Sequence, residues 1–234
     1  MEISVREAAQ RLGVDESRVR QLLRGGDLVG RRVGRSWLVR GEDLAPLQAR
    51  RRLPGRPMGP ARGWGALDLL TQGSAPWLSP AARSQVRSAI RLLVDADADR
   101  WRSALHGRSR VLRCRAHPAA VTRLLGNDRV LAAGAVEAAR RGVDLVATDE
   151  ITQVYVAEEQ WPSLASSLFI REEHRDTNLV VRLPRGLWPF GDATEANVAA
   201  LAADLLESAE PRAISGGVAK LRELTRLLMG GQAL

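Results

Sequence analysis

Acidic residues recur at every second position in one segment, Asp95-Ala96-Asp97-Ala98-Asp99. Carboxylates at that spacing on a β-strand point to one face, where they can hold the divalent cation of a nuclease or a nucleotidyltransferase. The surrounding residues are rich in alanine and favour a helix, so the run is predicted to be a solvated turn. A metal-dependent enzyme that uses this run is the catalytic alternative, and we do not favour it.

The sequence holds no other recognisable catalytic motif. It has no GxxxxGK[ST] phosphate loop, no GxGxxG loop after a strand and no GxSxG nucleophile elbow. The three histidines, His106, His117 and His174, are scattered, and the single Cys114 excludes a multi-cysteine zinc site. We therefore expect no enzymatic activity, no catalytic residues, no metal and no cofactor.

Positive charge is concentrated at one end of the chain. Residues 1–63 hold 14 Arg against 7 Asp and Glu, a net charge of +7. The remaining 171 residues hold 21 Lys and Arg against 20 Asp and Glu, a net charge of +1. A basic balance confined to one end is typical of a separate module that binds a polyanion. The charge distribution therefore predicts that the N-terminal region binds double-stranded DNA.

Two short helices are predicted at the start of the chain. Ser4 can cap a helix that runs to Leu12, and Glu7 three residues later completes a capping box. Asp15 can cap a second helix over residues 16–24, which ends at two glycines. The glycine between these helices lets them turn and approach closely.

A hairpin and a linker are predicted to follow. In residues 28–39, two apolar stretches flank a tip rich in Gly and Arg, which predicts a β-hairpin wing. A third short helix is expected to begin within residues 41–44. Residues 49–63 are rich in Pro, Gly and Arg and are predicted to be a linker, with residues 1–48 as a winged helix-turn-helix domain.

The N-terminal domain resembles the excisionase-type branch of the MerR-like winged helices. The matching stretches are SVREAAQRLGV at residues 4–14, SRVRQL at residues 17–22 and GRSWLV at residues 34–39. They cover about the first fifth of the chain. The resemblance implies DNA binding by the exposed face of the second helix, with the wing on phosphate or in the minor groove.

The arginines of the linker have two interpretations, as a basic arm that follows phosphates or as solvated surface charge. With them included, the predicted DNA-binding residues are Ser4, Glu16, Ser17, Arg18, Arg20, Gln21, Arg24, Arg31, Arg32, Arg35, Arg50, Arg51 and Arg52. One module offers few base contacts, so we expect two protomers, as a homodimer on DNA, to bind repeated half-sites of an operator.

Residues 64–234 are predicted to form a larger mixed α/β domain with helical ends, so the fold class is α/β (α+β). Strands are expected at residues 111–116, 144–147, 151–156, 169–170 and 179–183, with a short apolar piece at 130–133. Helices are expected within residues 64–105 and at 119–125, 135–141, 161–168, 197–207 and 218–229, with Gly216-Gly217 at a helix boundary. No apolar run is long enough to span a membrane and no signal peptide is evident, so we expect a cytoplasmic protein.

This C-terminal domain resembles that of the AbiEi-type antitoxins of type IV toxin–antitoxin systems, over residues 110–225. The similar stretches are AVEAA at 135–139, DLVA at 144–147, VYV at 154–156, NLVVR at 178–182 and AADLLE at 202–207. The resemblance implies a protein that represses its own operon and counteracts a nucleotidyltransferase-like toxin. The excisionase-like N-terminal domain departs from the winged helix that is usual in that family.

An apolar loop, Trp188-Pro189-Phe190, has two interpretations. It either covers the edge of the sheet or supplies partner-binding anchors, Trp188 and Phe190, because Trp is enriched at the centres of protein interfaces. Two other functions stay open for the whole chain. One is a transcription factor whose C-terminal domain senses a small ligand, and the other is an excisionase-like recombination factor.

Overall fold

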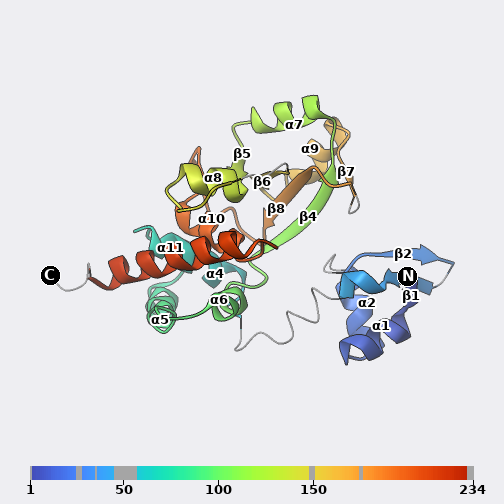
Figure 1. The fold of residues 1–234 in the computed structure, drawn as a ribbon, viewed down its shortest axis with the longest axis horizontal. Helices are drawn as coiled ribbons and strands as arrows, with labels where there is room; N and C mark the ends of the chain where they lie inside the picture. The colour runs from blue at the N-terminus through green and yellow to red at the C-terminus, as the bar shows by residue number, and fades with distance from the viewer. Residues whose placement is uncertain are drawn as a thin grey trace. The chain divides into compact units, whose positions relative to one another are not determined.

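The computed structural model divides the chain into two units, Met1–Pro54 and Gly55–Leu234 (Figure 1). We call them the N-terminal unit and the C-terminal unit and describe each by itself. The described residues are 2–24, 28–34, 36–44, 57–147, 151–173 and 176–230. Four predicted DNA-binding residues, Arg35, Arg50, Arg51 and Arg52, lie outside the described residues.

The N-terminal unit combines two helices with a small antiparallel sheet. Its elements are β1 (Glu2–Ser4), α1 (Val5–Leu12), α2 (Glu16–Arg24), β2 (Gly30–Val33), β3 (Ser36–Arg40) and the 3-10 helix η1 (Gly41–Asp43). The strands β2 and β3 form the predicted wing, and the sheet order is β1-β3-β2. The strand β1 was not predicted, because three residues are too few to show the alternation of apolar and polar side chains that identifies a strand. Helix, turn, helix and wing thus appear in the predicted order.

Local capping fixes where the two helices begin. The Oγ atom of Ser4 accepts a hydrogen bond from the backbone N–H of Glu7 at 3.1 Å, and Asp15 accepts one from the N–H of Arg18 at 2.8 Å. Such caps satisfy amide groups that have no partner within the helix. Gly13 ends α1 in the left-handed conformation, with φ 59°, which glycine adopts without steric cost. The predicted N-caps of both helices are confirmed.

One apolar core joins these elements. Ala8 and Leu12 of α1 pack with Val19 and Leu23 of α2, at the spacing that places residues on one helix face. The side chain of Val39 in the middle strand is fully buried in the same core. The core therefore fixes which face of α2 is left for solvent.

The C-terminal unit is a mixed α/β fold, as predicted. Its helices are α4 (Pro60–Leu70), α5 (Pro80–Arg91), α6 (Ala98–Ala104), α7 (Pro118–Leu125), α8 (Gly134–Arg140), α9 (Trp161–Ser167), α10 (Val198–Leu205) and α11 (Pro211–Gly230). Its strands are β4 (Ser109–Arg115), β5 (Val130–Ala133), β6 (Thr152–Val156), β7 (Arg171–Glu172) and β8 (Leu179–Pro184). The acidic run of residues 95–99 lies before and within α6, where Asp97 is the N-cap.

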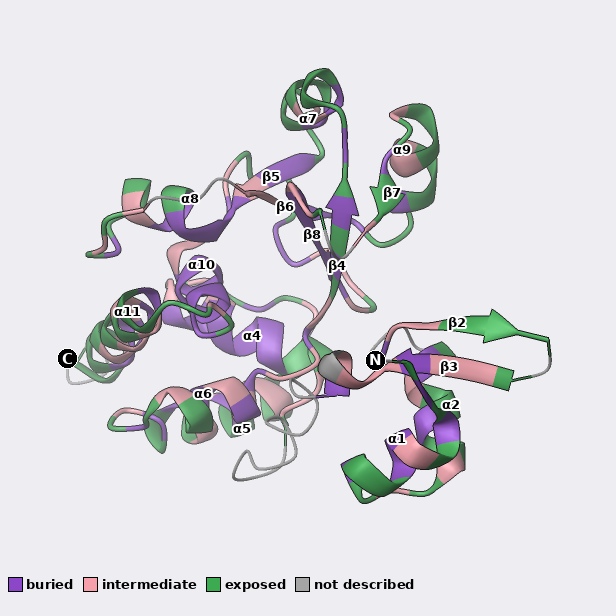
Figure 2. Ribbon diagram, turned by 45° about the vertical axis from the view of Figure 1, so that its right-hand side comes forward, coloured by how far each residue is buried: buried purple, intermediate pink, exposed green. Residues whose placement is uncertain are grey.

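The five strands form one sheet in the order β5-β6-β8-β4-β7. Only β6 and β8 are parallel; the other neighbouring strands are antiparallel. Side chains alternate between the two faces. Val154 faces a core with α7 and α9, whereas Tyr155 faces a larger core that includes α4, α10 and α11. Figure 2 shows these helices around the sheet, with buried residues in purple. The sheet is therefore covered by helices on both sides.

The predicted linker ends too late. Residues 60–63 belong to α4, which begins at Pro60. Proline suits the first turn of a helix, since the N–H group that it lacks would have no partner there. Gly63 and Trp64 are buried, and the indole Nε1 of Trp64 donates to the carbonyl of Arg108 at 2.9 Å. The Pro and Gly residues at the start of α4 were therefore mistaken for linker residues.

Two predicted strands and a predicted helix boundary are wrong. Residues 144–147 are not a strand, because they cross α11 at Gly216 instead of pairing with another strand. Phe169 has a φ of 53° in the turn after α9, so the strand β7 begins only at Arg171. Gly216 and Gly217 lie inside α11. A Cβ atom at Gly217 would meet the carbonyl oxygen of Ala202 at 2.5 Å, so glycine lets α11 pack directly on α10.

Among the described residues, no helix has the length and apolar character needed to cross a membrane.

Candidate nucleic-acid interface

The helix α2 has one buried face and one exposed face. Val19 and Leu23 point into the core of the N-terminal unit. Ser17, Arg18, Gln21 and Arg24, on other sides of the helix, are exposed. Since buried positions recur every three to four residues, the polar positions form a continuous stripe along the outer side. The structure therefore brings these four predicted DNA-binding residues together on one surface.

Hydrogen bonds organise this stripe. The guanidinium Nη1 of Arg18 donates to Oε1 of Gln21 at 2.6 Å, and Arg20 forms an ion pair with Glu16 at 2.5 Å. Both pairs are between neighbours on the helix surface. Arg18 and Gln21 therefore present their remaining hydrogen-bonding groups side by side. The charge of Arg20 is already offset by the carboxylate of Glu16.

Two of the predicted residues also cap helices. Ser4 caps α1 through its hydroxyl oxygen, and the hydroxyl of Ser17 donates to the carboxylate of Asp15, the cap of α2. This hydrogen bond from Ser17, followed by the one from the N–H of Arg18, lowers the pKa of Asp15 below its ordinary value of 3.8. The cap is thus strongest when Asp15 is ionised. Ser17 supports the start of the helix that carries Arg18 and Gln21.

The wing supplies two more of the predicted residues, Arg31 and Arg32, both exposed. Arg31 forms a bidentate ion pair with Glu2 of β1, with Nε 2.7 Å from Oε1 and Nη2 2.6 Å from Oε2. This hydrogen-bonded pair lowers the pKa of Glu2 below its ordinary value. Sequence reasoning missed Glu2, because its pairing with Arg31 depends on a strand register that the local pattern does not contain.

A buried ion cluster lies between the sheet and α10 in the C-terminal unit. Asp204 of α10 pairs with Arg108 and with Nε of Arg182 at 3.1 Å, and it accepts a hydrogen bond from the hydroxyl of Tyr155. Glu207 pairs with Nη1 of Arg182 at 2.8 Å. Burial, followed by the negative charge of Asp204, raises the pKa of Tyr155 well above its ordinary value. Two arginines face two carboxylates, so the cluster carries no net charge.

This cluster has a structural role. Arg108, Arg182 and Asp204 are each at most 5% exposed, so no dissolved substrate reaches them. Their charges instead join the sheet to a helix distant in sequence. A single arginine within the otherwise apolar stretch of residues 179–183 was the available sequence signal. A charge in the middle of a buried strand requires a buried partner.

Phe190, one of the two partner-binding anchors considered for this loop, is buried. Its ring is 8% exposed and lies 5.4 Å from the ring of Trp64 and 4.8 Å from that of Tyr155, between ring centroids. Trp188 is half-buried, stacks edge-on against Phe190 at 5.0 Å and donates from Nε1 to the carbonyl of Gly191 at 3.0 Å. Three neighbouring aromatic rings bury more apolar area than an exposed loop would. The loop covers the core.

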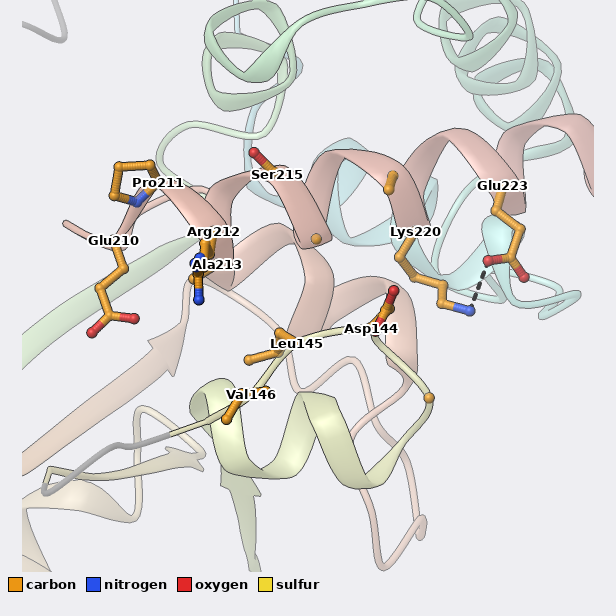
Figure 3. Close-up of a pocket in the computed structure, with 13 residues that line it drawn as sticks. Asp144, Leu145, Val146, Glu210, Pro211, Arg212, Ala213, Ser215, Lys220 and Glu223 are labelled. Atoms are coloured by element: carbon orange, nitrogen blue, oxygen red, sulfur yellow. Dashed lines mark ion pairs between the residues drawn. The ribbon is translucent and has the colours of Figure 1, made fainter.

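A pocket of about 750 Å³ lies between α11 and the segment 142–146 (Figure 3). Arg212 and Lys220 supply positive charge, and Lys220 forms an ion pair with Glu223 at 2.8 Å. Leu145 and Val146 supply apolar surface opposite the helix (Figure 3). The volume lies within the range of small-molecule sites. No sequence motif predicted this pocket, because its two walls are far apart in the chain.

Comparison with known families gives one match. A family model described as a helix-turn-helix domain matches residues 2–52. The match confirms the predicted helix-turn-helix domain and indicates DNA binding and regulation. Comparisons with curated proteins and with solved structures give no significant match.

Proposed function

We propose that this protein is a transcriptional repressor that binds an operator through α2 and the wing. The observation that carries the proposal is the arrangement of Arg18 and Gln21, hydrogen-bonded to each other on the exposed face of α2. In helix-turn-helix proteins the second helix enters the major groove with such a face. The family match of residues 2–52 supports the same assignment.

The two side chains match the chemistry of base edges. An arginine fork donates two hydrogen bonds to O6 and N7 of guanine, and a glutamine amide pairs with N6 and N7 of adenine. Because Arg18 already donates to Gln21, the two side chains are ordered before they meet DNA. Arg24 and the wing then contribute positive charge toward the phosphates, which determine register and affinity.

One α2 helix reads only a few bases, so repression by this protein requires two protomers on a repeated site. Half-sites would be separated by one helical turn of DNA, about 34 Å, or by a multiple of it. Footprinting on the DNA immediately upstream of the gene for this protein tests the arrangement. Two protected half-sites at that spacing are expected, and a single unrepeated protected segment would contradict it.

We propose further that the C-terminal unit binds a protein partner and acts as the antitoxin to a nucleotidyltransferase-like toxin. The ground for this role is the resemblance to the AbiEi-type antitoxins inferred from the sequence of residues 110–225, together with the near-neutral charge of residues 64–234. Co-expression with the neighbouring gene, followed by a growth-rescue assay and pulldown, tests it. Rescue by the full chain is expected; toxicity that persists without any complex would exclude the role.

The second candidate function is repression controlled by a small ligand. The pocket between α11 and the segment 142–146 favours it, since its volume suits a metabolite and its lining mixes apolar and charged side chains. Its test is whether metabolite extract from the host shifts operator affinity in the wild type and not in Ala219→Trp, which fills the pocket. An equal shift in both proteins would remove the pocket from consideration.

A further inference from the structure

The two arginines of the wing strand β2 lie on opposite faces of the sheet. Arg31 is paired with Leu38 across the hairpin, and Arg32 is paired with Trp37. Successive residues of a strand point to opposite faces, so two adjacent arginines cannot contact the same side of the wing. The predicted contribution of the wing to DNA binding therefore divides between two different surfaces.

The face of Arg32 is the one turned toward α2. Gly30, two residues earlier, shares that face, and a Cβ atom placed on Gly30 would lie 2.7 Å from Cδ2 of Leu23 in α2. Trp37, directly opposite Arg32, is half-buried and packs against the core to which Val19 and Leu23 of α2 belong. Arg32 therefore extends from the side of the wing on which the DNA-reading helix lies, and it is exposed there.

The face of Arg31 is turned the other way and carries Glu2, with Arg40 of β3 directly opposite Glu2. The two guanidinium–carboxylate hydrogen bonds, of 2.7 and 2.6 Å, bridge β2 to β1 across the middle strand β3. A planar fork that makes two parallel bonds fixes orientation better than a single contact does. The pair connects the wing to the first strand of the chain, and its negative partner opposes any approach of phosphate to Arg31.

We propose that Glu2 is a positioning residue that holds the wing through Arg31, and that Arg32 is the wing arginine that contacts DNA phosphate. This assignment rests on the proposed DNA-binding function. It replaces the expectation of equal roles for Arg31 and Arg32 with two distinct ones. The partner of Arg32 is the phosphate backbone of double-stranded DNA, and the partner of Arg31 is Glu2.

The test measures affinity of the full chain for a random-sequence duplex as a function of salt concentration. A phosphate contact releases about one counterion, so its loss flattens the slope of log K against log salt by about 0.9. Arg32→Gln is expected to flatten the slope by that amount. Arg31→Gln and Glu2→Gln are expected to keep the wild-type slope and to weaken binding equally, by a few fold, since each breaks the same pair.

The double variant Glu2→Arg with Arg31→Glu, which exchanges the two charges, tests whether Arg31 forms a clamp with Glu2 or contacts DNA phosphate. A clamp re-forms with reversed charges, so affinity is expected to recover part of the way toward the wild-type value, because the arginine at position 2 then also faces Arg40. Flattening by Arg31→Gln, tighter binding by Glu2→Gln, or failure of the swap to recover affinity would overturn the role of Glu2. An unchanged slope for Arg32→Gln would overturn the role of Arg32.

Two controls keep the outcomes distinct. Arg123→Gln removes an exposed arginine from α7 in the C-terminal unit and should leave the slope unchanged. Circular dichroism at each salt concentration identifies a variant whose fold has changed. If the wild-type chain showed no salt-dependent binding, the proposed function itself would fail, and that result differs from any outcome for the wing variants.

Discussion

The side chains of Arg18 and Gln21 hold each other in the free protein, with Nη1 of one 2.6 Å from Oε1 of the other. A recognition surface with this contact is ordered before DNA arrives, so less side-chain entropy is lost on binding. The contact also makes the two residues energetically dependent on each other.

Removing either residue should weaken operator binding. We expect Arg18→Ala and Gln21→Ala each to cost about 1–3 kcal/mol if each makes one good base contact. Because the side chains touch, the double variant should cost less than the sum of the single ones. Electrophoretic shift titrations of the four proteins measure this. Full additivity would mean that the hydrogen bond does not survive in the complex, and unchanged affinity would exclude α2 as the reading helix.

The buried ion cluster should be sensitive to loss of one carboxylate. Asp204→Ala leaves Arg108 and Arg182 with too little negative charge around them, and breaking a buried pair in this way costs about 3–5 kcal/mol. Tyr155→Phe removes only one hydrogen bond and should cost less, about 1–3 kcal/mol. Urea unfolding followed by tryptophan fluorescence compares them. Equal costs would contradict the assignment of Asp204 as the counter-charge.

Two of the glycines in α11, Gly217 and Gly230, should differ in their tolerance of alanine. Gly217→Ala forces a Cβ atom against the carbonyl of Ala202, and overpacking of this kind costs about 1–3 kcal/mol. Gly230→Ala, near the end of the same helix, meets nothing within 4 Å and should be neutral or stabilising. Thermal unfolding of the two variants measures the difference. Similar melting temperatures for the two variants would show that α11 can move away from α10 without a loss of stability.

Cys114 should report unfolding of the C-terminal unit. Its side chain is fully buried, and burial raises the pKa of its thiol to about 12, so the reactive thiolate is scarce at neutral pH. We expect no reaction with a thiol reagent at pH 8 in native buffer and complete reaction in denaturant. Rapid labelling of the native protein would show that β4 opens locally.

Acid should weaken the cap of α2. The pKa of Asp15 is lowered on folding, so the stabilisation is present above the unfolded value, near 3.8, and is lost as pH falls through the lower folded value. We expect Asp15→Asn, which retains a capping side chain, to lose less helical signal than the wild type as pH falls below 3.8. An identical acid titration of both proteins would exclude Asp15 as the titrating cap.

Local signals predicted much of the N-terminal unit. Ser4 and Asp15 begin their helices as expected, because a cap and an apolar stripe act within a few residues. The pairing of Glu2 with Arg31 depends on two strands meeting across a third, which no local pattern encodes. The helix-turn-helix was therefore predictable, and the wing clamp was not.

In the C-terminal unit, long-range packing decided where prediction failed. Gly217 lies inside α11 and not at its end. The residue is glycine because α10 packs so closely that no Cβ atom would fit. Phe190 is buried because Trp64 and Tyr155, each far away in sequence, converge on it. The sequence of its loop left two interpretations open, because neither of these ring contacts is visible in the local pattern. Tertiary contacts overrode both local signals.

The ion cluster also makes the sheet of the C-terminal unit depend on residues that follow it in the chain. Arg182 lies in β8 and Arg108 directly precedes β4, whereas their counter-charges come from Asp204 in α10 and from Glu207, two residues past its end. A chain that stopped before α10 would close its sheet around two unneutralised guanidinium groups. A chain shortened in that interval, by ribosomal stalling or by proteolytic cleavage, is therefore expected to be less stable than the whole unit.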